Sequence, residues 1–199
     1  KIPLSYQKRG MLEPALDSVM FNASKGYIYG PYLSNGSYKV AKLIDSRVGP
    51  DSVKARHILL NPVSLGGVVV AKQKADSIKN LIQKGGDFAK LAAEFGTDGS
   101  KDSGGDLGTF GRGAMIPKFE DAVFGASVGQ VFTLETQYGV HIIQVQNQIG
   151  SSKVVKVAVV DKALAPSSQT EQAAYQKAQS FLSSVSNQTQ FQEAAQKQN

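Results

Sequence analysis

The chain has two histidines, and each lies in a short segment whose alternating apolar residues are typical of a β-strand. His57 lies in VKARHILL and His141 in VHIIQVQ. Neutral imidazole donates a hydrogen bond from one ring nitrogen and accepts at the other, so the rings can bond to each other if their strands are neighbours. The alternatives are satisfied core histidines, or a zinc site completed by Asp98 or Asp106. Because no short-spaced pair of metal ligands is present, we predict no metal site.

Other chemistries find little support in the sequence. It contains no cysteine, which excludes thiol catalysis, disulfides and thiolate metal sites. No serine lies in a nucleophile-elbow pattern, and the pairs Gly66-Gly67 and Gly104-Gly105 lack the spacing and lysine of a phosphate-binding loop. The net charge is +6, but the basic residues are spread along the chain. We therefore predict no cofactor and no nucleic-acid partner.

Three large apolar side chains, Leu107, Met115 and Phe119, lie in the glycine-rich stretch GGDLGTFGRGAMIPKFEDAVF. Pro117 suits the first turn of a helix, and this helix would place Phe119 and Val123 on one face. The three side chains could line an apolar pocket or belong to the ordinary core. The pattern alone favours core, because apolar residues at helical spacing are most often buried for packing.

The predicted elements around these residues are a strand, two helices, a strand, a helix and a hairpin. This order implies an antiparallel sheet flanked by helices, in an α+β fold. The glycine pair Gly85-Gly86 ends the first helix, Asp87 caps the second, and the polar segment 96–103 predicts a loop. The predicted strands are 53–60, 107–110, 130–135 and 140–146, and the predicted helices are 69–84, 88–95 and 117–124.

The two ends of the chain align with this central unit when the sequence is shifted by 103 residues. Residues 4–36 then fall on 107–139, and Phe88 falls on Phe191. The chain is therefore predicted to hold half a unit, one whole unit and another half. The predicted domains are residues 1–49, 50–150 and 151–199, separated by loop-like segments at 46–50 and 149–152.

The length of 199 residues, with 41% hydrophobic and 19% charged residues, is typical of a soluble globular protein of one or two domains. No apolar run approaches the ~18 residues that a membrane helix needs, and no signal-peptide pattern opens the chain. Because the sequence stops at Asn199 inside a helical pattern, we expect a piece of a longer protein, with any leader or membrane anchor outside it. The missing cysteines are mildly consistent with an oxidising compartment.

Four motifs of the central unit cover nearly all of residues 51–148: ARHILL, DFAKLAAEFGTDGS, GGDLGTFGRGAMIPKFEDAVF and TQYGVHIIQV. With these motifs the chain resembles the parvulin family of peptidyl-prolyl cis-trans isomerases. The resemblance implies a four-stranded antiparallel sheet flanked by helices, and isomerisation of X-Pro bonds without a covalent intermediate.

The resemblance also implies roles for individual residues. His57, Asp98 and His141 would form the polar part of the site, and an apolar set would hold the proline ring of the substrate. The segment between the first strand and the first helix has no arginine cluster, so specificity for phosphoserine-proline is not expected. The residues expected to bind substrate are Leu107, Met115, Phe119, Thr136 and Tyr138.

The flanking half-units lack both histidines, and we expect them to complete a second, inactive parvulin-like module. Each half alone would leave apolar residues bare, among them Ile28, Val40 and Leu43 in the first half. Pairing between two chains would instead give a domain-swapped dimer. The residues that would be bare in the second half are Val155, Val157, Phe181 and Phe191.

This arrangement is similar to the SurA- and PpiD-like foldases of the bacterial periplasm. The similarity implies a cell-envelope location and clients that are unfolded or partly folded polypeptides with X-Pro bonds. Two alternatives from other classes stay open. One is a holdase or adaptor that binds unfolded chains without isomerisation, and the other is a scaffold whose repeats only make protein contacts.

Overall fold

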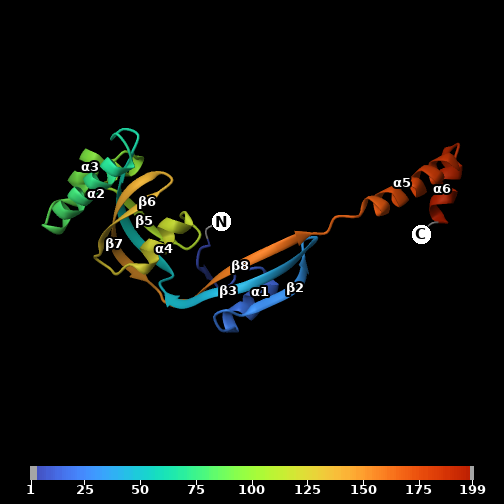
Figure 1. Ribbon diagram of the computed structural model, residues 1–199, viewed down its shortest axis with the longest axis horizontal. Helices are drawn as coiled ribbons and strands as arrows, with labels where there is room; N and C mark the ends of the chain where they lie inside the picture. The colour runs from blue at the N-terminus through green and yellow to red at the C-terminus, as the bar shows by residue number, and fades with distance from the viewer. Residues whose placement is uncertain (1–3, 198–199) are drawn as a thin grey trace. The chain divides into compact units, whose positions relative to one another are not determined.

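The computed structural model describes residues 4–197, so the predicted domain limits at residues 1 and 199 lie outside the described residues. Its strands form two four-stranded sheets, which we call the central sheet and the terminal sheet (Figure 1). The elements in chain order are β1 (Gln7–Lys8), α1 (Pro14–Asn22), β2 (Ile28–Ser34), β3 (Ser37–Gly49), β4 (Ser52–Leu60), α2 (Val68–Gln83), α3 (Phe88–Phe95), the 3₁₀ helix η1 (Gly99–Ser103), β5 (Asp106–Gly111), α4 (Pro117–Gly125), β6 (Val131–Thr136), β7 (Gly139–Ile149), β8 (Ser152–Ala163), α5 (Ser168–Ser183) and α6 (Gln188–Gln196).

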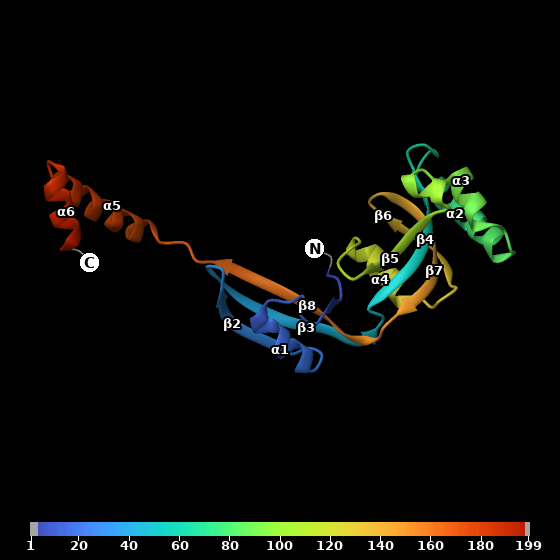
Figure 2. The same ribbon diagram turned by 180° about the vertical axis from the view of Figure 1, so that it is seen from behind.

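The central sheet has the strand order β5-β4-β7-β6, and each neighbouring pair is antiparallel. Helices α2 and α3 cover one face and α4 covers the other, which Figure 2 shows from behind. The register of β4 and β7 places Leu59 opposite His141 and His57 opposite Ile143. The two histidines are therefore diagonal neighbours on one face. The predicted α+β fold with a four-stranded antiparallel sheet flanked by helices is confirmed.

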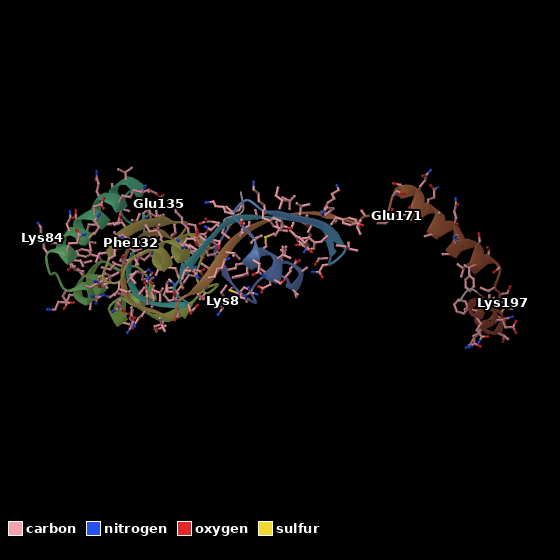
Figure 3. All side chains as sticks on the ribbon, turned by 90° about the horizontal axis from the view of Figure 1, so that it is seen from below. Lys8, Lys84, Phe132, Glu135, Glu171 and Lys197 are labelled. Atoms are coloured by element: carbon pink, nitrogen blue, oxygen red, sulfur yellow. The ribbon has the colours of Figure 1, made fainter. Side chains whose placement is uncertain are left out.

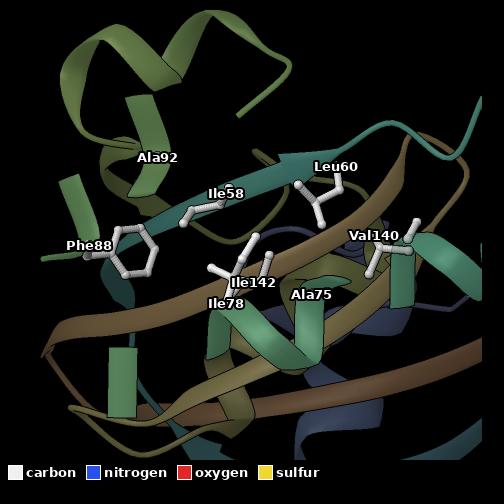
Figure 4. Close-up of a cluster of buried hydrophobic side chains, with 9 residues drawn as sticks. Ile58, Leu60, Ala75, Ile78, Phe88, Ala92, Val140 and Ile142 are labelled. Atoms are coloured by element: carbon white, nitrogen blue, oxygen red, sulfur yellow. The ribbon is translucent and has the colours of Figure 1, made fainter. Parts of the chain in front are cut away.

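Two apolar cores hold the central sheet between its helices. The core under α2 and α3 draws on β4 and β7, and Figure 4 shows its side chains meeting between the sheet and the helices. Asp87 caps α3 as predicted, because its carboxylate accepts hydrogen bonds from the N–H groups of Ala89 and Lys90. The buried residues of the core on the other face, under α4, are Val53, Ala55, Phe110, Phe119, Val123, Phe124, Ile143 and Val145.

The terminal sheet has the strand order β1-β8-β3-β2, and it combines strands from both ends of the chain. Helix α1 buries Leu16, Met20 and Phe21, while Leu43 and Val155 are among the buried residues of the sheet. The strands of the two half-units therefore lie in one sheet, and Leu43, Val155 and Val157 are not bare. Helices α5 and α6 bury no side chain, and their side chains can be followed between Glu171 and Lys197 in Figure 3.

The connecting segments are shorter than the sequence predicts. Residues 46–49 belong to β3 and Ile149 belongs to β7, so only two residues separate β3 from β4 and β7 from β8. The physical reason is that the ladder continues to the strand ends, where Ser52 still pairs with Ile149. The segment predicted as the loop 96–103 also contains η1. None of the described helices is both long and apolar enough to cross a membrane.

The described chain divides into two compact units. The larger one comprises residues 1–30 and 40–160, and it includes the whole central sheet. The smaller one comprises residues 31–39 and 161–199, so it contains the tip of the β2–β3 hairpin and the helices α5 and α6.

Candidate active site

Two imidazole rings meet on the face of the central sheet that α4 covers. The Nδ1 atoms of His57 and His141 lie 3.0 Å apart, and the two rings are stacked with centroids separated by 5.2 Å. Both side chains are buried, at 7% and 4% exposure. The neighbouring strands β4 and β7 therefore bring the two rings together as the strand pattern predicts, with a hydrogen bond between them.

The histidine pair lies in the middle of a longer chain of polar groups. His57 Nε2 lies 3.0 Å from Asp98 Oδ2, and His141 Nε2 lies 2.8 Å from Thr136 Oγ1. One assignment of protons satisfies every bond with both rings neutral: Thr136 O–H donates to His141, His141 Nδ1–H donates to His57, and His57 Nε2–H donates to Asp98. At the other end, the Tyr138 N–H donates to Thr136 Oγ1. Such a chain fixes both tautomers, and its members polarise one another.

Burial and neighbouring charge set the ionisation of two members of this chain. Burial, and after it the neighbouring His57, lowers the pKa of His141 to about 4, although Asp98 opposes the shift. Burial alone would raise the pKa of Asp98, but the charge and hydrogen bond of His57 and the bonds from Ser100 lower it overall. The site at neutral pH therefore has a neutral imidazole at His141 and a carboxylate at Asp98.

An apolar cavity of about 310 Å³ adjoins the two histidines. Leu107 reaches it from β5, Met115 from the segment before α4, and Phe119 from the first turns of α4. The Phe119 ring meets His57 and His141 edge to face, with centroids 6.0 and 5.4 Å apart. The full lining is His57, Leu59, Leu107, Ala114, Met115, Ile116, Phe119, Tyr138 and His141.

The structure brings most of the sequence-predicted site residues to this cavity. Leu107, Met115, Phe119 and Tyr138 line it, whereas Thr136 reaches it only through its bond to His141. Their roles in binding stay a prediction. In a similar way, Asp98 is not part of the lining and contacts the site through His57.

The sequence analysis missed three lining residues, which are Leu59, Ala114 and Ile116. A signal was present for Leu59, because side chains two apart in a strand share a face and Leu59 follows His57 by two. No comparable signal marks Ala114 and Ile116. They lie in the irregular segment between β5 and α4, where no period links sequence to direction.

No group of three histidine, cysteine, aspartate or glutamate side chains that could hold a metal ion occurs among the residues 4–197. Asp106, considered as a third ligand, accepts from the Gly108 N–H and lies 3.9 Å from Lys54 Nζ. The arrangement around the histidines offers an apolar cavity, a carboxylate and a neutral imidazole. It can grip an apolar ring and present polar groups to it.

Comparison with known proteins identifies relatives of this architecture. The profile of a family described as the PPIC-type PPIase domain matches residues 38–149. Chaperone SurA of Pseudomonas fluorescens strain Pf0-1 is 32% identical over 148 residues, which cover 71% of this chain and 35% of that protein. Foldase protein PrsA of Geobacillus sp. strain WCH70 is 43% identical over 98 residues, which cover 48% of this chain and 32% of that protein.

Among solved structures, PrsA from Bacillus subtilis matches with a TM-score of 0.43 and 28% identity, over 74% of this chain and 48% of that chain. The chain spans about a third of the length of the curated relatives SurA and PrsA.

Proposed function

This chain belongs to the PPIC-type parvulin family, and we propose that its central domain, residues 50–150, isomerises X-Pro bonds in unfolded or folding proteins. The observation that carries the proposal is the apolar cavity bordered by the hydrogen-bonded histidine pair. A cavity of about 310 Å³ has room for a proline ring, and its lining offers mostly carbon to that ring.

The reaction needs no bond to be made or broken at the protein. Rotation about an X-Pro bond crosses a barrier of ~18–20 kcal/mol that comes from amide resonance, and the twisted amide has lost that resonance. A site that holds the twisted form better than either planar form therefore lowers the barrier. Exclusion of water helps, because water stabilises the more dipolar planar amide. The proposed mechanism is non-covalent.

The residues of the site divide this work between them. Leu107, Met115 and Phe119 would hold the proline ring, which anchors one side of the rotating bond. Asp98 would act through its charge, which reaches the cavity by way of His57. The two histidines would form the rigid base of the cavity, because each ring is held by two hydrogen bonds and contacts the Phe119 ring. Tyr138, at the rim, is 59% exposed and would contact the substrate chain.

The segment between β4 and α2 supports activity on unphosphorylated substrates. Residues 61–67 read NPVSLGG and contain no lysine or arginine. A phosphate next to the proline would be recognised by paired basic side chains, which are absent from this segment. We therefore propose no preference for phosphoserine or phosphothreonine before the proline.

Proposals for the longer protein rest on the named relatives. SurA is a chaperone and PrsA a foldase by name, so we propose unfolded polypeptides as clients and the bacterial envelope, in particular the periplasm, as the location. We also propose that the terminal sheet is the core of a second parvulin-like module without a site, built from residues 1–49 and 151–199. The missing histidines make that module inactive as an isomerase.

A refolding assay tests the proposed activity against the holdase alternative. The client should be an unfolded protein whose slow phase is limited by proline isomerisation, which takes ~10–100 s without a catalyst. We expect this chain to accelerate the slow phase at substoichiometric concentration. Suppressed aggregation with an unchanged slow phase would contradict the isomerase proposal and favour a holdase.

A further inference from the structure

One wall of the cavity is a segment without regular structure. Residues 112–116 lie between β5 and α4, and Gly113 turns the chain there with a φ of 86°. The next three residues, Ala114, Met115 and Ile116, line the cavity. Because the segment belongs to neither a strand nor a helix, regular backbone bonds do not fix the path of its middle residues. The wall therefore needs another support if the cavity is to keep its shape.

Glu120 supplies this support from the start of α4. Its carboxylate oxygen Oε2 accepts a hydrogen bond of 2.6 Å from the Gly113 N–H, and its own N–H donates to Ile116 O over 3.0 Å. The side chain and main chain of one residue thus hold both ends of the segment 113–116. Successive residues of a helix point about 100° apart, so Phe119 faces the cavity while Glu120 turns toward the segment.

The burial of Glu120 shows that packing alone does not explain this residue. The side chain is 1% exposed, and burying a carboxyl is unfavourable unless it is hydrogen-bonded. Burial raises the pKa of Glu120, and the charge of Asp121 adds to the shift. The Gly113 N–H opposes the shift, as do the Arg112 charge and the Met115 backbone. An apolar side chain would fill the same space without this cost, so the bond to Gly113 is what the carboxyl adds.

The second buried charge beside the segment, Arg112, does not make such a bond. Its side chain is 6% exposed, and its guanidinium carbon lies 4.3 Å from the centre of the Phe124 ring. None of its three guanidinium nitrogens has a hydrogen-bond partner within the described part of the chain. Arg112 thus opposes the charge of Glu120 but contributes no hydrogen bond to the wall. Substitutions can therefore separate the charge of Glu120 from its hydrogen bond.

We propose that Glu120 is a positioning residue of the cavity, which holds the segment 113–116 so that Met115 and its neighbours face the substrate ring. This role rests on the proposed isomerase function, which gives the cavity its substrate. If the segment leaves its position in part of the molecules, the apparent affinity falls in proportion, whereas a substrate once bound meets an unchanged site. Loss of the bond should therefore raise KM and leave kcat nearly unchanged. A fold that is merely weakened has a different effect, since it reduces the amount of active protein and lowers the apparent kcat at constant KM.

Two double variants of the full chain isolate the hydrogen bond. The glutamine variant, Arg112→Met with Glu120→Gln, keeps an oxygen that can accept from the Gly113 N–H. The methionine variant, Arg112→Met with Glu120→Met, has a side chain of similar length without that acceptor. Both lack the two buried charges, and uncharged replacements of a buried charged pair are often tolerated, so both should fold. With Ala-Leu-Pro-Phe as substrate, the methionine variant should have a KM roughly 10-fold above that of the glutamine variant, and a kcat within about twofold of it.

Amide exchange of Gly113, followed by NMR, tests the same bond without turnover. Exchange should be at least about 10-fold faster in the methionine variant than in the glutamine variant, because the N–H loses its buried partner. Equal KM values in the two variants, equal exchange rates, or a loss of kcat at constant KM would each overturn the role of Glu120. A wild-type chain that turns over no X-Pro peptide would instead contradict the proposed function, and the exchange rates would then decide whether Glu120 holds the segment.

Discussion

The central and terminal sheets share one strand order but differ in what surrounds them. The central sheet has helices on both faces, and the face toward α4 holds the histidine pair and the cavity. The terminal sheet has α1 packed on one face, and its other face exposes Ile28, Val40 and Val160. Both histidines of the chain lie in the central sheet.

The difference shows that this architecture does not by itself make a site. Both sheets bury an apolar helix face, and Leu16, Met20 and Phe21 in α1 do the packing that Phe119, Val123 and Phe124 do in α4. The candidate site in the central sheet has two further features, a chain of hydrogen-bonded polar side chains and an apolar cavity beside it. Single substitutions can remove each of them separately.

The largest effect is expected from loss of the Phe119 ring. Phe119→Ala should lower kcat/KM for X-Pro peptides by on the order of 100-fold, because it removes the wall that faces the proline ring and both histidines. It should also cost about 3–5 kcal/mol of stability, since the side chain is buried. Phe124→Leu is the matched control in the same helix, since Phe124 is buried but outside the cavity. An equal loss of kcat/KM in Phe119→Leu and Phe124→Leu would contradict the proposal that Phe119 binds the proline ring.

The histidine pair predicts a pH dependence of stability that the terminal sheet cannot supply. The folded pKa of His141 is about 4, below its unfolded value of 6.5. Between these two pH values the unfolded chain therefore binds a proton at His141 that the folded chain does not bind. The free energy of unfolding should therefore rise between pH 4 and 6.5, by about 3 kcal/mol at most, and contribute no slope above that.

Two carboxyls modify this profile at its acid end. The lowered pKa of Asp98 adds to the rise of stability with pH below the ordinary aspartate pKa of 3.8. Burial raises the pKa of Glu120, so this carboxyl gives the opposite slope above the ordinary glutamate pKa of 4.5. Chemical denaturation at a series of pH values measures the sum, and His141→Gln should lose most of the slope between pH 5 and 6.5. An unchanged slope in that variant would contradict the account of His141.

A smaller effect is expected at Asp98, which contacts the site only through His57. Asp98→Asn keeps an oxygen that can accept from His57 but removes the charge, and we expect kcat to fall by roughly 10-fold with little change in KM. Asp106→Asn, on the exposed start of β5, is the control and should retain activity. A rise in KM alone would mean that Asp98 binds substrate rather than favouring the twisted amide.

The smallest effect on activity is expected from damage to the terminal sheet. Leu16→Ala removes a fully buried side chain under α1 and should cost about 2–5 kcal/mol in that region. Isomerase activity at a temperature where the central sheet stays folded should change less than about twofold, since additivity holds for distant sites. Amide exchange locates the destabilised region. A large loss of activity with an intact central sheet would mean that the site extends beyond it.

Much of the central unit could be predicted from its sequence, because local signals agree with the fold there. Gly85 with Gly86 and Asp87 separate α2 from α3 as predicted, and the strand with His57 alternates as a half-buried strand should. The contact between His57 and His141 needed one assumption, that β4 and β7 are neighbours. The register confirms that assumption.

The remaining features depend on relations that no local pattern encodes. The segment between β5 and α4 supplies Ala114, Met115 and Ile116 to the lining of the cavity, and the directions of these side chains follow no regular period. Thr136 is the last residue of β6 and pairs with Gly139, the first residue of β7, so its bond to His141 depends on the two-residue turn between these strands. The strand character of residues 46–49 follows from a long ladder with a partner more than 100 residues away, not from their composition.

The central claim is that the cavity beside His57 and His141 isomerises X-Pro bonds without a phosphate. The most direct test measures the isomerisation rate of Ala-X-Pro-Phe peptides, with X as alanine, leucine, serine or phosphoserine, for the wild-type chain and for Phe119→Ala. The account predicts acceleration of the unphosphorylated peptides by the wild type, no advantage for phosphoserine, and strong loss in the variant. Acceleration of the phosphopeptide alone, or equal rates for wild type and Phe119→Ala, would contradict it.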